Sequence, residues 1–137
     1  MNVNVKGSGF IPLFLFLHMS NYGFEGLGFY PASMKLWDLC RQDSETLCKD
    51  YRGKEISAQL IRSAGSIPAN IEEGYGRISA KEYIRYLTYT LGSARESRGW
   101  YKKSNRLLSA RLIKERIDLI AQIIGKVHKT IRTLKKK

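Results

Sequence analysis

Residues 56–75 read ISAQLIRSAGSIPANIEEGY, and the apolar pattern of this stretch decides the fold class. Its apolar residues recur at spacings of 4, 4, 3, 4 and 4, which places them on one face of an α-helix: Ile56, Leu60, Ala64, Ile67, Ile71 and Tyr75. Pro68 removes the helical hydrogen bond to the carbonyl of Ala64 and favours a kink. Because the apolar register continues across the proline, we predict one bent helix and not two.

Small residues gather around this proline and at the end of the predicted helix. Ser63, Ala64, Gly65, Ser66 and Ala69 would allow a neighbouring helix to approach closely at the bend. Further along, Gly74 or Gly76 can adopt the left-handed conformation that commonly ends a helix.

One helix is expected before this one and one after it. Upstream, Pro31 suits a first helical turn, and the apolar pattern predicts a helix from about residue 31 to residue 48, although Asp43 interrupts its stripe. Downstream, Ser79 and Glu82 form a capping box, in which each side chain satisfies a free amide at the helix start. This capping box predicts a helix over about residues 79–105.

The last predicted helix begins near Ser109 and has the most regular pattern. Its apolar residues alternate spacings of 4 and 3, which is a heptad seam: Ile113, Ile117, Ile120, Ile124, Val127, Ile131 and Leu134. Four helices with short connections predict an all-α, up-and-down four-helix bundle.

The bundle is expected to occupy residues 30–137, after an irregular lead-in of residues 1–29 that is rich in glycine near its end. The apolar run at residues 10–17 is too short to span a bilayer, so no membrane association is expected. We expect natural translation to begin at Met19, which leaves residues 1–18 out of the fold.

Basic residues are concentrated at the end of the chain. The 137 residues include 24 Lys and Arg against 12 Asp and Glu, a net charge of +12. Residues 1–99 hold 12 basic and 10 acidic residues, whereas residues 100–137 hold 12 basic and 2 acidic ones. A surface of one sign attracts polyanions, so RNA or DNA is the expected partner; the alternative is that the charges only solvate a terminal helix.

The candidate phosphate contacts lie opposite or beside the seam of the last helix and in the tail that follows it: Arg111, Lys114, Lys126, Lys129, Arg132, Lys135, Lys136 and Lys137. Part of this pattern has a purely structural explanation. Lys126, Lys129 and Arg132 lie in the last turns, where cations complement the helix dipole.

Residues that could support catalysis, a metal or a cofactor are scarce. Cys40 and Cys48 are eight residues apart in a predicted helix, or about 12 Å along its axis, so they cannot pair with each other. The chain has two histidines, His18 and His128, which leaves few ligands for a zinc site, and no nucleophile or phosphate-loop motif is present. We expect no metal, no cofactor and no enzymatic activity, and we expect a reducing, cytoplasmic location.

Residues 66–77, SIPANIEEGYGR, closely resemble the signature of the four-helix-bundle proteins encoded in 23S ribosomal RNA intervening sequences. That family usually reads Ser-Ile-Pro-Ala-Asn-Ile-Ala-Glu-Gly, followed by an aromatic residue, Gly and Arg, so the main departure is Glu72. The resemblance covers about residues 22–137, including residues 92–96, GSARE, which look like the small-residue patch of the family's third helix.

The resemblance implies a cytoplasmic bacterial four-helix bundle that assembles into a homopentamer and has a basic surface suspected of binding nucleic acid. The accessory variability proteins of diversity-generating retroelements are a related branch with a similar fold. By analogy with that branch, the resemblance also implies a partner enzyme that acts on RNA or DNA. A fold shared with a family does not by itself assign a function.

The motif residues are expected to be structural or to contact a neighbouring subunit: Pro68, Asn70, Glu73, Gly74, Arg77 and Glu96. Asn70 would satisfy backbone freed by Pro68, and Glu73 can pair with Arg77 four residues later. Glu96 would meet an arginine inside the bundle.

The sequence leaves three functions open. The first is a non-enzymatic, oligomeric nucleic-acid-binding bundle, and the second is a protein–protein scaffold, including an accessory subunit to a nucleic-acid enzyme. An RNA-processing enzyme is disfavoured because no acid/base pair is visible. Tyr83, Tyr86 and Tyr89 could stack on bases beside Arg85, but they spread round their helix and Tyr83 is expected in the core.

Overall fold

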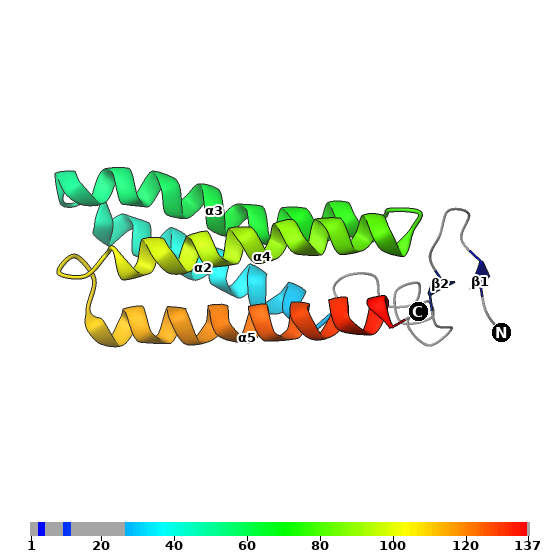
Figure 1. Ribbon diagram of the computed structural model, residues 1–137. Helices are drawn as coiled ribbons and strands as arrows, with labels where there is room; N and C mark the ends of the chain where they lie inside the picture. The colour runs from blue at the N-terminus through cyan, green and yellow to red at the C-terminus, as the bar shows by residue number, and fades with distance from the viewer. Residues whose placement is uncertain (1–2, 5–9, 12–26, 137) are drawn as a thin grey trace.

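The computed structural model describes residues 3–4, 10–11 and 27–136, and most of them lie in four long helices (Figure 1). These helices are α2 (Phe29–Leu47), α3 (Tyr51–Tyr75), α4 (Ala80–Lys102) and α5 (Ala110–Lys135). Two short strands, β1 (Val3–Asn4) and β2 (Phe10–Ile11), pair in antiparallel fashion, which the sequence pattern did not predict. The expected start at Met19, the lead-in of residues 22–26 and Lys137 lie outside the described residues.

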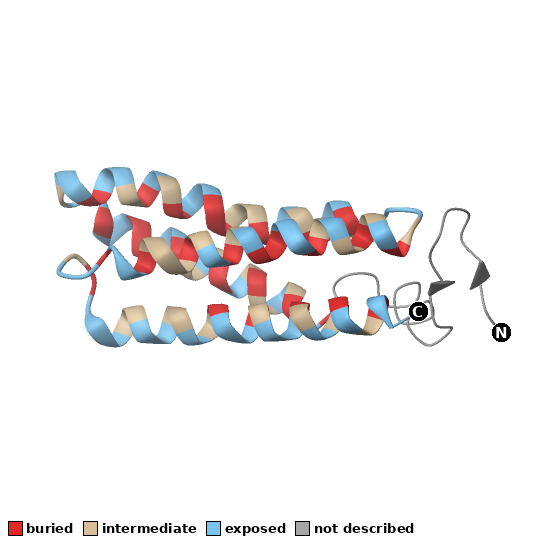
Figure 2. Cartoon of the chain, in the orientation of Figure 1, coloured by how far each residue is buried: buried red, intermediate tan, exposed pale blue. Residues whose placement is uncertain are grey.

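The helices pack as an all-α bundle, which confirms the predicted fold class. α3 lies against α2 and α4, and α5 packs against α4 and α2, with short connections between successive helices (Figure 1). The buried residues lie mainly on the sides of the helices that face the other helices (Figure 2). The predicted stripe of α3 is correct at its centre, where Leu60, Ala64, Ile67 and Ile71 are fully buried.

Helix α3 runs without interruption through Pro68, as predicted, and its small residues contact both neighbours. The Ser97 hydroxyl of α4 donates to the Ser63 hydroxyl of α3 over 3.0 Å, inside the core. On the other side, a Cβ at Gly65 would lie 3.2 Å from the Trp37 ring of α2. The predicted close approach to neighbouring helices is therefore confirmed.

The predicted role of Gly74 and Gly76 as a left-handed helix end is wrong. Gly76 ends α3 with a φ of −80°, and Gly74 lies inside the helix, where it is buried. A Cβ on Gly74 would lie 2.4 Å from the Cβ of Tyr86. Glycine is needed at position 74 because α4 passes too close for any side chain.

Asp43 joins three helices in the core instead of interrupting one. Its carboxylate is 4% exposed and accepts hydrogen bonds from the Tyr101 hydroxyl (2.7 Å), from Arg116 Nε (2.8 Å) and from Arg116 Nη2 (3.1 Å). Burial and the hydrogen bond to Asp43 raise the pKa of the Tyr101 hydroxyl. Burial also raises the pKa of the adjacent Cys40 thiol to about 12. Both groups are therefore neutral at physiological pH.

The seam predicted for α5 is correct only in part. Ile120, Val127, Ile131 and Leu134 are buried, but Ile123 takes the buried position expected for Ile124. In the first half of the helix, the core position is occupied by Arg116, which reaches inward to Asp43. The predicted seam residues Ile113 and Ile117 are consequently only half-buried.

The close contact at Gly74 predicts a strong effect of a single methyl group. Replacing Gly74 by Ala should lower the free energy of unfolding by about 2 kcal/mol, because the new Cβ overlaps Tyr86. Gly92 is the matched control, since it also lies in a helix and nothing lies within 4 Å of its position. Gly92→Ala should stabilise the fold by up to about 1 kcal/mol. Urea unfolding of both variants measures the difference, and equal behaviour would contradict the account of Gly74.

The buried ion pair predicts a strong dependence on both of its partners. Asp43→Ala leaves the Arg116 guanidinium without its partner in the core and should cost about 3–5 kcal/mol. The double variant Asp43→Leu with Arg116→Met removes both charges and should recover most of that loss. Urea midpoints of the two variants test this, and a cost under about 1 kcal/mol for Asp43→Ala would show that the pair does not hold α5.

Candidate nucleic-acid interface

Helix α5 forms one side of the bundle, and much of its length is coloured as exposed (Figure 2). All of the predicted residues that the structure describes are exposed: Arg111, Lys114, Lys126, Lys129, Arg132, Lys135 and Lys136. They divide into two groups at opposite ends of the helix, with the acidic residues of α5 placed at only one of these ends.

At the start of α5, the predicted cations are paired with acidic neighbours one turn later. Arg111 Nε lies 3.3 Å from Glu115 Oε1, and Lys114 Nζ donates to Asp118 Oδ2 over 2.7 Å. The hydrogen bond to Asp118 raises the pKa of Lys114. Because these four side chains sum to no net charge, they contribute little attraction for phosphates.

At the other end, the cations have no such neighbours. We call Lys126, Lys129, Arg132, Lys135 and Lys136 the C-terminal basic face. Within the described part of the chain, none of these five side chains makes an ion pair. They span about 15 Å of helix axis, about twice the screening length of about 8 Å at physiological salt. Successive cations are three residues or fewer apart, or at most about 4.5 Å along the axis, so neighbouring charges reinforce one another.

One further cation extends this region across the seam between α4 and α5. Arg95 Nη2 lies 3.4 Å from His128 Nε2, and His128 stands between Lys126 and Lys129 in the sequence. The sequence did not indicate that Arg95 is a neighbour of α5. No local pattern could have shown it, because the two residues are 33 positions apart and meet only through helix packing.

The motif residues of α3 are engaged in contacts within the bundle. Arg77 pairs with Glu73 at 2.8 Å, as predicted, and the Tyr86 hydroxyl of α4 both accepts from Arg77 (2.7 Å) and donates to Glu73 (3.2 Å). Asn70 departs from its expected role, because its amide donates to the Ser66 carbonyl over 2.8 Å. A side chain in a helix reaches the carbonyl four residues back, whereas the carbonyl freed by Pro68 is six residues back.

Glu96 also fulfils its predicted structural role. It pairs with Arg62 of α3, and Arg62 in turn donates to the Gln59 side-chain oxygen over 3.0 Å. The contacts of Glu73, Arg77 and Glu96 therefore join α3 to α4, and Pro68 is buried in α3. Each of these three charged side chains is thus engaged in a contact within the bundle.

The tyrosines of α4 separate into one core residue and two surface residues. Tyr83 is 2% exposed, as expected. Tyr86 and Tyr89 meet edge to face at 5.6 Å, and Arg85 Nε donates to the Tyr89 hydroxyl over 2.7 Å. Glu73 and Glu82 lie beside the arginines here, so this cluster lacks the positive excess of the C-terminal basic face.

Neither a metal-ligand cluster nor a membrane-spanning helix occurs in the described residues. They contain no group of three or more His, Cys, Asp and Glu residues that could hold a metal ion. None of their helices is both long and apolar enough to cross a membrane.

The chain is similar to a known family and to a solved structure. The model of a family described as 23S rRNA-intervening sequence protein matches residues 25–133. A crystal structure described as a protein with unknown function from the S23 ribosomal protein family, from Bacteroides thetaiotaomicron, superposes with a TM-score of 0.71. It shares 21% identity, with 75% of this chain and 97% of that chain covered, which shows the fold alone. No curated protein sequence matches.

Proposed function

Because this chain belongs to the 23S rRNA-intervening sequence protein family, we propose that it is a non-enzymatic protein that binds RNA or DNA through the C-terminal basic face. The observation that carries the proposal is the absence of ion pairs at these five cations within the described residues. Cations that are not already paired can release the counterions of a phosphate backbone on binding.

The side chains available at this face favour contacts to the backbone over the reading of bases. Lysine and arginine head groups bind phosphates of any sequence. The hydroxyls of Thr130 and Thr133, which lie between them, donate to the backbone carbonyls of Lys126 and Lys129 over 3.1 and 3.0 Å. We therefore expect binding with little sequence preference and a steep dependence on salt.

Charge removal at the C-terminal basic face tests the proposal. The triple variant Lys126→Gln, Lys129→Gln, Arg132→Gln should weaken binding at low salt and reduce the slope of log affinity against log salt by about 2 to 3. Fluorescence anisotropy with labelled RNA and DNA of one sequence, at several salt concentrations, measures both quantities. Circular dichroism should show unchanged helicity, because all three residues are exposed.

The matched control carries its substitutions at the other end of the same helix. Arg111→Gln with Lys114→Gln removes cations that are paired with Glu115 and Asp118, so its effect on affinity should be clearly smaller. An affinity that the triple variant leaves unchanged would overturn the proposal. An equal loss in the control and the triple variant would overturn the assignment to this end of the helix.

The proposal includes assembly into a homo-oligomer, with a pentamer as the family resemblance implies. Several copies of the C-terminal basic face in one particle would bind a long polyanion more tightly than one copy does. Sedimentation velocity at micromolar concentration should give a mass about five times that of the chain. A monomeric mass over the same concentration range would contradict this part of the proposal without affecting the charge-removal test.

A further inference from the structure

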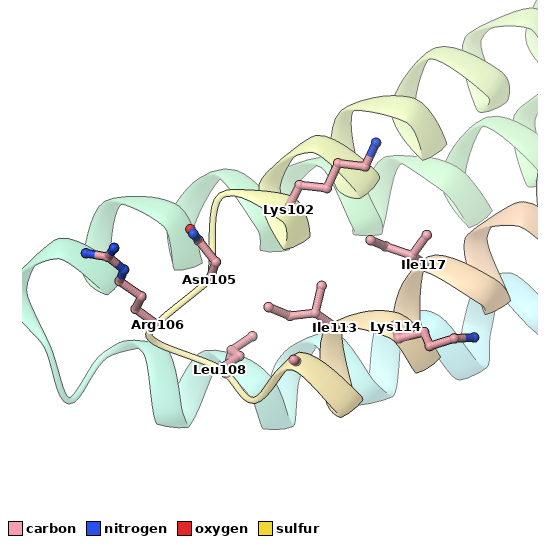
Figure 3. A pocket seen from close by; sticks show the side chains of 8 residues that line it. Lys102, Asn105, Arg106, Leu108, Ile113, Lys114 and Ile117 are labelled. Carbon is pink, nitrogen blue, oxygen red and sulfur yellow. The ribbon is translucent and has the colours of Figure 1, made fainter.

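A groove lies between the end of α4 and the start of α5, away from the C-terminal basic face (Figure 3). It has a volume of about 400 Å³, and Leu108, Ala110, Ile113 and Ile117 form its apolar lining. Figure 3 shows Ile113 and Ile117 pointing into the space between the two helices, with Leu108 at one end. A cavity of this size accommodates one or two large side chains.

Ile113 and Ile117 are only half-buried because of how α5 attaches to the core. Arg116 occupies the inward position in the first half of the helix and reaches Asp43, so Ile113 and Ile117 face sideways. They would otherwise continue the buried seam of Ile120, Val127 and Ile131. The exposed parts of these two half-buried isoleucines give the groove an apolar lining that a ligand can contact.

The rim of the groove is positively charged. Lys102, Arg106 and Lys114 line it together with Asn105, and the lining includes no acidic residue. Their charged ends extend outward around the apolar space (Figure 3). Lys114 is paired with Asp118, whereas Lys102 and Arg106 make no ion pair among the described residues. The complementary ligand is therefore apolar at its centre and acidic at its edges.

Arg106 reaches this rim from a strained backbone. Its φ is 72°, and it is the one non-glycine residue with a positive φ in the described chain. Hydrogen bonds from the amides of Leu107 and Leu108 to the Ser104 carbonyl hold the turn in this shape. Glycine adopts such a φ without strain, so an arginine here places a cation at the groove against its own backbone preference.

We propose that the groove binds an acidic segment of another protein. Leucine or isoleucine side chains of that segment fill the space over Ile113 and Ile117, and carboxylates on either side of them pair with Lys102 and Arg106. Nucleic acid fits this groove less well, because the lining has no aromatic ring on which a base could stack. The groove thus adds a protein-binding site to the nucleic-acid face proposed above.

A labelled synthetic peptide provides the test. It carries leucines at helical spacing among aspartates and glutamates, and two matched peptides replace either the leucines by serine or the acids by their amides. Binding should require both features, so each matched peptide should bind at least about tenfold more weakly. Amide chemical shifts should change mainly in residues 102–117.

Variants of the full chain locate the binding site. Ile117→Ser should weaken binding of the acidic peptide about tenfold through loss of apolar contact. Arg106→Gly should weaken it about threefold and at the same time raise the melting temperature, because the strain at φ 72° is relieved. A loss of binding in a more stable protein separates the groove's role from folding. The triple variant of the C-terminal basic face serves as the control and should bind the peptide normally.

Three outcomes would overturn the proposal. The first is equal binding of the serine peptide and the leucine peptide, which would mean attraction by charge alone. The second is a loss of peptide binding in the triple variant of the C-terminal basic face, which would place the binding site there and not in the groove. Finally, self-association that blocks the groove and that Ile61→Asp abolishes would make a second copy of the chain the occupant. Ile61 is the side chain that such a copy would insert, because it lies beside the acidic residues Asp38 and Glu45 on the outer surface. Each of these results leaves the nucleic-acid test unaffected.

Discussion

The buried carboxylate of Asp43 ties α5 to the rest of the bundle, and the shape of the α5 surface depends on it. A carboxylate at 4% exposure needs donors, and it receives them from Tyr101 of α4 and Arg116 of α5. Removing one partner would leave a charge in a medium that solvates it poorly. The inward turn of Arg116 sets the rotation of α5 about its own axis. That rotation leaves Ile113 at the side of the helix, where the groove forms.

The sequence predicted what depends on neighbours within a few turns and missed what depends on distant partners. The helix bounds, the Ser79 cap and the Glu73–Arg77 pair all follow from spacings of three or four residues. Asp43 looked like an interruption because its partners lie 58 and 73 positions away. Gly74 is ambiguous in sequence for the same reason, since a glycine can serve a left-handed turn or a close contact. Only the position of Tyr86 on α4 decides between them.

The candidate site was predictable to a similar extent. The concentration of charge in the last quarter of the chain is visible by counting. Its division along α5 was also open to prediction, because Glu115 and Asp118 follow Arg111 and Lys114 at the spacing of four that favours helical ion pairs. The family signature gives no such guidance, since Glu73, Gly74 and Arg77 hold α3 against α4. The surfaces proposed for binding lie on α5, outside that signature.

The two surfaces share a sign of charge but differ in what surrounds the charge, and salt should separate them. At the C-terminal basic face the cations stand on a polar helix surface, so attraction is almost wholly electrostatic and fades as the Debye length shrinks to about 3 Å at 1 M salt. In the groove, Ile113 and Ile117 add an apolar contribution that salt does not screen. Together the two proposals assign to one helix two anionic partners whose binding responds differently to the same change in ionic strength.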